Sequence, residues 1–353
     1  MPGSEHHQAR GPQHAAERLA GLGEREWWID QPGMGDDAQE LAETGMAQRA
    51  GPSASSISRA PARRCWASSS RCAYTRMFVS TAITRGLPSA RRGYPGLGNP
   101  VGIGLANEID TGMAMRTIMY AFGASVQDQE HNLVLGGKPT LEAVKFVKAL
   151  FQEAMTPEVF TWDASSNNRA MIAGRVSLAL NAISITRTAE KDNPDMSGKI
   201  QLTKALQGPA RAIGLEHVMQ CYVAWKFAEN IDGAKQFLVD YTSDFRQAFR
   251  AGEFYDFPCF PNTVPDLKTL IANDPEAHPP DKYTVLGDVT EWATNVGYPG
   301  YANAAIDEIF GTWVINVMFA KAASGSATPE EALREAEVAA KRIFGKWKEK
   351  GLV

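Results

Sequence analysis

Apolar residues recur every three or four positions after residue 137, which predicts an amphipathic helix. Pro139 and Thr140 open this helix, and we expect Thr140 to be its N-cap. Charged and polar residues occupy the other side, as in a helix that lies on a core. The expected buried stripe is Leu141, Val144, Val147, Leu150 and Phe151.

The clearest helix-start signal is the run Thr328-Pro329-Glu330-Glu331. It places an N-cap Thr before a Pro at the first helical position, and Glu331 stands three residues after the Thr. This is a capping box, in which each side chain accepts a hydrogen bond from an otherwise unpaired backbone N–H. The stripe expected to be buried behind it is Leu333, Ala336, Ala340, Ile343 and Trp347.

Shorter apolar runs predict strands. Residues 101–107 suit a buried strand, and residues 176–180 alternate apolar and small polar side chains, as in a half-buried strand. A second strand pair is expected over 212–218 and 221–225. Together with the helices the pattern indicates a helix-rich α/β protein. The other expected helices cover 111–122, 166–173 (ended by Gly174), 232–241 (with Phe237 and Leu238 inward), 283–296 and 303–323.

Composition changes abruptly near residue 100. The first hundred residues hold 12 Arg, no Lys and 9 acidic residues, for a net charge of +3; the remainder holds 24 basic and 31 acidic residues, for −7. The early segment also lacks periodic apolar positions, so we expect it to be of low order. Three explanations compete: an Arg-rich targeting peptide, a basic arm for nucleic acid, and out-of-frame translation of a GC-rich gene. We favour the last.

Whole-chain properties narrow the function classes. The chain has 353 residues and a net charge of −4, which gives no global basic field for nucleic acid. No apolar run approaches the roughly 18 residues of a membrane span, and the N-terminus does not read as a secretory leader. The four cysteines form no zinc-type spacing; a disulfide between Cys221 and Cys259 stays open, with two buried thiols as the default.

Four stretches after residue 98 resemble the ABC-transporter solute-binding protein family that includes the maltose-binding protein. They are GKPTLEAVKFVKALFQE, NNRAMIAGRVSLALNAIS, ENIDGAKQFLVDYTSDFRQAF and AKAASGSATPEEALREAEVAAKRI. The resemblance covers residues 99–353 and implies an α/β fold of two lobes that close over a ligand. It assigns 99–210 and 283–353 to the C-terminal lobe and 211–282 to the returning part of the N-terminal lobe. The first half of the N-terminal lobe is then missing or replaced by residues 1–98.

The same resemblance implies a function. A protein of this kind binds a sugar or polyol and delivers it to an ABC permease in the membrane. It works in the periplasm, is a monomer, makes or breaks no bond and needs no cofactor, metal or nucleic acid.

Candidate ligand residues lie where strands end, because sugars need convergent polar groups and flat aromatic faces. Asn107 is the last residue of the 101–107 strand, and Glu108 and Asp110 follow it. A helix N-cap through Asp110 or Thr111 explains these residues equally well. Asn181 and Ser184 end the next strand, and here we favour ligand binding over loop capping. Trp162 fits a core anchor and a stacking platform equally.

Two further groups complete the candidates. Tyr298, Tyr301 and Asn303 lie in an aromatic turn, which we favour as a stacking wall over a plain Pro-Gly turn. Glu216 and His217 fall where the chain should cross between lobes. Cys221 stands nearby, but with no further ligand cluster we reject a metal site and keep both as ligand contacts.

Two alternatives to a binding protein remain. A glycoside hydrolase would need two carboxylates facing each other across the scissile bond, and Glu108, Asp110 and Glu216 are the acids available. Their spacing gives no sign that they converge, and no nucleophile elbow, phosphate loop or dinucleotide fingerprint is present. The other alternative is a truncated gene product without function, which would expose apolar surface.

Overall fold

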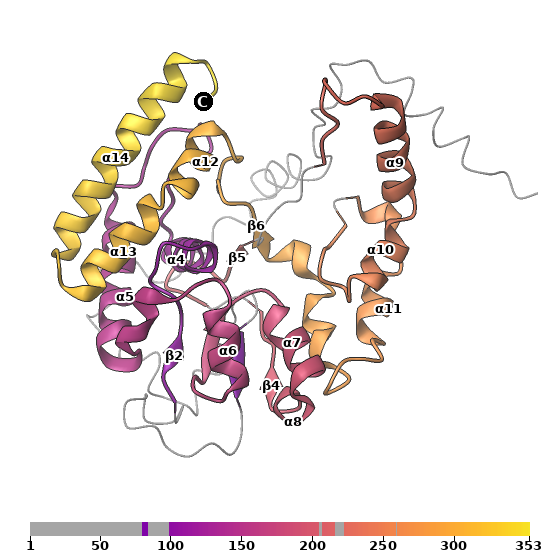
Figure 1. The fold of residues 1–353 in the computed structure, drawn as a ribbon. Helices are drawn as coiled ribbons and strands as arrows, with labels where there is room; N and C mark the ends of the chain where they lie inside the picture. The colour runs from indigo at the N-terminus through magenta and orange to yellow at the C-terminus, as the bar shows by residue number, and fades with distance from the viewer. Residues whose placement is uncertain (1–79, 84–98, 205–206, 216–221, 259) are drawn as a thin grey trace, which may run out of the picture.

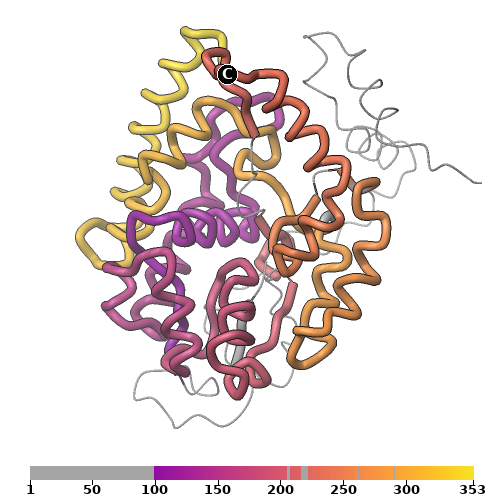
Figure 2. The backbone as a smooth tube through the Cα atoms, turned by 45° about the vertical axis from the view of Figure 1, so that its right-hand side comes forward, coloured from indigo at the N-terminus to yellow at the C-terminus, as the bar shows by residue number. Residues whose placement is uncertain are grey.

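The structure is a computed structural model that describes residues 80–83, 99–204, 207–215, 222–258 and 260–353. Helices form two groups on either side of short strands (Figure 1). Figure 2, turned by 45°, shows α9–α11 in red and orange on the right and the yellow C-terminal helix on the left, and the two groups overlap at the top of this view. The helices are α4 (Ile109–Ala121), α5 (Lys138–Ala154), α6 (Ser166–Ile172), α7 (Ser184–Asp192), α8 (Pro194–Ser197), α9 (Ile231–Ser243), α10 (Phe245–Ala251), α11 (Leu267–Ala272), α12 (Ala304–Gly311), α13 (Val314–Ser324) and α14 (Pro329–Glu349).

The main helical body is built from α4, α5 and α12–α14, with α13 packed against both α5 and α14. The predicted stripe of α5 is confirmed at Val144, Val147 and Leu150, which are buried. Its predicted N-cap is wrong: Gly137 caps the helix, and Thr140 is buried inside the first turn. The cap moved because Pro139 already occupies a position in the first turn, where its missing N–H costs nothing.

The last helix starts as the sequence predicts. The Thr328 hydroxyl accepts from the Glu331 N–H, and the Glu331 carboxylate accepts from the Thr328 N–H. The expected stripe is buried except for Trp347, which packs against the core while partly exposed. Trp347 Nε1 also donates to the Glu308 carboxylate at 2.6 Å, which ties α14 to α12.

The strands form a four-stranded sheet in the order β2-β3-β1-β4 and a separate pair, β5 with β6. β2 runs parallel to β3, and β1 lies antiparallel between β3 and β4. Gly102 allows β2 to approach its neighbours, because a Cβ there would lie 2.8 Å from Val176. The strands are β1 (Ser80–Ile83), β2 (Val101–Gly102), β3 (Leu178–Leu180), β4 (Ile200–Gln201), β5 (Gly214–Leu215) and β6 (Ala293–Thr294).

Several strand predictions need correction. The 101–107 run pairs only at Val101–Gly102, and β3 is buried on both faces instead of one because Leu178 and Leu180 pack in one core cluster and Ala179 packs in another. Gly214–Leu215 pairs in parallel with Ala293–Thr294, not with 221–225. The low-order prediction for 1–98 stays a prediction: Ser80–Ile83 supply β1, and the remaining residues up to 98 lie outside the described part.

Three helix predictions also change. The segment 283–296 contains two 3-10 turns, Lys282–Leu286 and Val289–Glu291, followed by β6. The expected helix over 303–323 breaks into α12 and α13, where Trp313 adopts a φ of 60°. Phe237 of α9 points outward and is 64% exposed, contrary to prediction. Within the described residues no helix is long and apolar enough to span a membrane.

Candidate functional site

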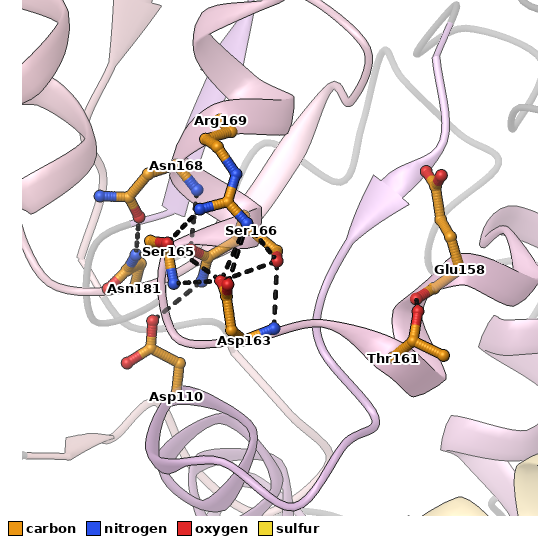
Figure 3. Close-up of polar contacts among 10 residues, drawn as sticks. Asp110, Glu158, Thr161, Asp163, Ser165, Ser166, Asn168, Arg169 and Asn181 are labelled. Carbon is orange, nitrogen blue, oxygen red and sulfur yellow. Dashed lines mark hydrogen bonds and ion pairs between the residues drawn. The ribbon is translucent and has the colours of Figure 1, made fainter.

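A chain of amide and hydroxyl groups joins the end of β3 to the first turns of α4, α6 and α7. Asn181 follows β3, and its Nδ2 donates to Asn168 Oδ1 (2.6 Å) and to Asn167 Oδ1 (3.1 Å). Asn167 Nδ2 in turn donates to Asp110 Oδ2 at 3.0 Å, and Asn168 Nδ2 donates to Ser184 Oγ at 3.2 Å. Figure 3 shows Asn168 and Asn181 joined above Asp110. The structure therefore brings the predicted residues Asp110, Asn181 and Ser184 into one cluster.

Tyr255 reaches this cluster from the other group of helices. Its hydroxyl lies near the Ser184 side chain, which acts to lower the pKa of that hydroxyl, and Tyr255 is 39% exposed. Burial of the hydroxyl, together with the nearby Asp110 carboxylate, raises the pKa of Tyr255. The cluster thus combines an aromatic face with polar groups that can both donate and accept hydrogen bonds.

Glu108 caps α4 instead of Asp110 or Thr111. Its two carboxylate oxygens accept from the Asp110 N–H (2.7 Å) and from the Thr111 N–H (2.5 Å). Burial raises the pKa of the carboxyl, while these hydrogen bonds act in the opposite direction. Asn107 is exposed. The N-cap of α4 that the sequence predicted is therefore present, but Glu108 provides it in place of Asp110 or Thr111.

A second polar group lies beside the cluster on the loop before α6. Asp163 accepts from the Ser165 and Ser166 hydroxyls and from Arg169, so its pKa lies well below the usual range. These side chains are solvent-accessible and hold the loop in shape. Trp162, next to Asp163, packs against two core clusters, which favours its interpretation as a core anchor.

The aromatic turn at 298–303 is held by Gln127. This fully buried side chain donates from Nε2 to the carbonyls of Gly297 and Tyr301 and accepts from Asn303 Nδ2 at 2.7 Å. Asn303 also caps α12, accepting from the N–H groups of Ala305 and Ile306.

The two tyrosines of this turn differ in their surroundings. Tyr298 packs on Tyr120 with ring centroids 5.4 Å apart, and its hydroxyl accepts from Arg211. The Tyr301 ring is 63% exposed. Among the described residues, the polar contacts of the turn do not connect it to Asn181 or Ser184, so a stacking role for it stays a prediction.

The remaining candidates give no further support. Glu216, His217 and Cys221 lie outside the described residues, as does Cys259, so the ligand role of the first two and the disulfide stay untested. In the described part of the chain, no three His, Cys, Asp or Glu side chains gather as a metal site would require. Sequence reasoning missed Asn167, Asn168 and Tyr255. The two asparagines stood in the quoted NNRAMIAG stretch, whereas Tyr255 carried no local signal.

Solved structures show which fold this arrangement belongs to. A maltose-bound MalE3 protein from T. maritima matches with a TM-score of 0.56 and 16% identity, over 76% of this chain and 72% of that one. The fold is that of the periplasmic solute-binding proteins. A solute-binding protein from Agrobacterium radiobacter K84 in complex with ribitol gives the same TM-score and identity, over 75% of this chain and 69% of that one.

A third match shows the limit of the likeness. A sugar transporter from Arthrobacter chlorophenolicus A6 with bound laminaribiose matches with a TM-score of 0.55 and 16% identity, over 69% of this chain and 60% of that one. No protein-family model and no curated protein sequence matches the chain. The fold assignment therefore rests on structural similarity alone, and the ligand must be inferred from the residues of this chain.

Proposed function

We propose that the chain binds a small sugar or polyol at the cluster formed by Asp110, Asn181, Ser184 and Tyr255. The observation that carries the proposal is the amide relay from Asn181 through Asn167 and Asn168, which ends beside the half-exposed Tyr255 ring. Each sugar hydroxyl both donates and accepts, and amide and hydroxyl side chains offer both functions. A tyrosine ring supplies the flat face on which C–H groups pack.

The fold supports a proposal for the biological role. Proteins with this fold include ones bound to maltose, laminaribiose and ribitol. We propose that the chain acts in the periplasm as a monomer and delivers its solute to an ABC permease. The lobe assignment of 99–210, 211–282 and 283–353 belongs to the same proposal.

A glycosidase is the weaker alternative. Both oxygens of Glu108 are engaged by backbone N–H groups of its own helix, which suits a cap more than a proton donor. Hydrolysis of an aryl glycoside that is abolished by Glu108→Gln would support the enzyme over the binding protein.

A titration calorimetry panel of maltose, laminaribiose, ribitol and mannitol tests the proposal. We expect saturable binding without turnover by at least one of them. Asn181→Ala should weaken that binding about tenfold or more, because the lost amide no longer orients Asn167 and Asn168, and roughly 1.4 kcal/mol corresponds to a factor of ten. Asn132→Ala is the matched control, since Asn132 is bonded only to Asp128 on an exposed loop. No heat from any of these solutes would count against a sugar or polyol site.

A further inference from the structure

Tyr255 follows an unusual turn. Glu253 and Phe254 both have positive φ, 55° and 59°, in the left-handed region that residues with a Cβ adopt only at a cost. Two such residues in succession persist only where their surroundings hold them, and they concentrate at functional sites. The turn places Tyr255 against Ser184, and the question is what keeps it there.

The Phe254 side chain provides one anchor. It is buried against Phe249, with ring centroids 4.9 Å apart, inside a core cluster that also contains Ile183 and Tyr283. The Arg187 guanidinium lies 5.8 Å from the Phe254 ring centroid and 3.9 Å from that of Tyr283. Arg187 therefore links α7, which begins at Ser184, to the turn that carries Tyr255.

A buried network of two cations and two anions fixes Arg187. Its guanidinium contacts Asp274 at 2.6 Å and Glu190 at 3.0 Å, and all three side chains are less than a tenth exposed. Lys282 lies 3.4 Å from Glu190 and donates to the Ser197 carbonyl and hydroxyl. Four buried charges contribute little more to the free energy of unfolding than apolar side chains of similar volume would. They are, however, compatible with few side-chain geometries. Such a network suits a role in orientation.

We propose that Arg187 is a positioning residue, which holds the strained Glu253–Phe254 turn on α7 so that Tyr255 stays at the ligand site. The proposal rests on the proposed function for its effect on binding. Its structural part, the hold on the turn, stands without any ligand. Ser184 and Tyr255 then belong to one pre-set wall of the site.

Amide hydrogen exchange of the ligand-free full chain tests the structural part. In Arg187→Met we expect amides 252–256 to exchange about tenfold faster or more, as local opening becomes easier. The control is Arg246→Met. Arg246 lies on α10, the helix that precedes the Glu253–Phe254 turn, and the substitution removes its ion pair with Asp266. Equal exchange over 252–256 in both variants would overturn the proposal. This result does not depend on whether a solute binds.

A double-mutant cycle on solute binding tests the positioning role. The solute is whichever of maltose, laminaribiose, ribitol and mannitol the wild type binds. For that solute, Arg187→Met should raise the Kd about tenfold. In a Tyr255→Ala background the same change should have an effect of less than about twofold, because Arg187 acts through Tyr255. Additive effects would contradict this role. A wild type that binds none of the four would contradict the proposed function and leave the exchange result to decide the hold on the turn.

Two further variants guard against simple unfolding. Arg187→Lys keeps the charge but loses the planar fork, so it should show an intermediate effect on exchange. Glu253→Gly removes part of the strain, since glycine adopts positive φ freely. In that background Arg187→Met should accelerate exchange less than in wild type, and an undiminished effect would show that the strained turn is not what Arg187 holds.

Discussion

Helices α13 and α9 both carry large apolar side chains, yet these side chains lie in opposite environments. Phe319 of α13 is completely buried between α5 and α14, whereas Phe237 of α9 is 64% exposed and no residue of α9 is buried. The Phe237 ring stacks on Tyr241, which Tyr222 meets edge-on, and the Trp225 ring stacks on Phe227. The exposed apolar side chains of this region are Tyr222, Val223, Trp225, Phe227, Phe237 and Phe260.

This difference shows what an amphipathic pattern does and does not specify. The sequence predicts a helix in both places, apolar on nearly every side in α13 and amphipathic in α9. What covers the apolar side chains depends on other parts of the chain: α13 has α5 and α14, and the described residues place nothing comparable over α9.

The largest expected effect contrasts the two phenylalanines. Phe319→Ala should lower the free energy of unfolding by about 3–5 kcal/mol, because it leaves a cavity in a closed core. Phe237→Ala should change it by less than about 0.5 kcal/mol, since the ring is mostly in water. Urea unfolding followed by circular dichroism measures both. Similar losses for the two variants would show that α9 is covered in solution.

A second pair compares helix caps. Asn303 caps α12 and also donates to the buried Gln127, so Asn303→Ala should cost about 1–3 kcal/mol through the lost cap and the unpaired amide. Asn230 caps α9 in the same way, through the Gly233 N–H, but it is exposed. Asn230→Ala should therefore cost about 1 kcal/mol or less in the same urea experiment. A larger loss at Asn230 would reverse the comparison of the two regions.

The smallest effect is a pH dependence at the start of α14. Backbone and hydroxyl hydrogen bonds from Thr328 lower the pKa of Glu331 below its usual 4.5. The folded pKa is depressed, so the contribution is present above the unfolded value and is lost as pH falls through the folded pKa. Thermal unfolding of wild type and Glu331→Gln should differ at pH 7, and the difference should shrink as the pH falls through the folded pKa, which lies below 4.5. A difference that does not shrink as the pH is lowered would exclude the carboxylate as its source.

The sequence was most informative where structure is local. The capping box at Thr328 and the stripe of α5 depend on neighbours within one or two turns, and both are confirmed. Strand partners depend on residues far along the chain: Gly214 pairs with Ala293, and Leu180 with Ser80. No spacing near residue 214 could reveal those pairings. The break at Trp313 did have a local signal, because Gly311 and Thr312 precede it and both have low helix propensity.

The residues of the candidate site show the same contrast between local signals and long-range contacts. Asp110, Asn181 and Ser184 were predicted because they follow strands or open helices, and the hydrogen bonds through Asn167 and Asn168 bring them together. Tyr255 was missed because its position depends on a left-handed turn and on an ion network between residues 187 and 274. Such long-range contacts leave no trace in the local sequence around residue 255.

The Gln127 amide has a consequence for any movement of this protein. Three hydrogen bonds from one buried side chain join the turn at 297–303 to the segment after α4. That turn and its exposed Tyr301 should therefore move with the helical body as one rigid unit. The turn could act as a mobile loop only if the hydrogen bonds of the Gln127 amide were broken.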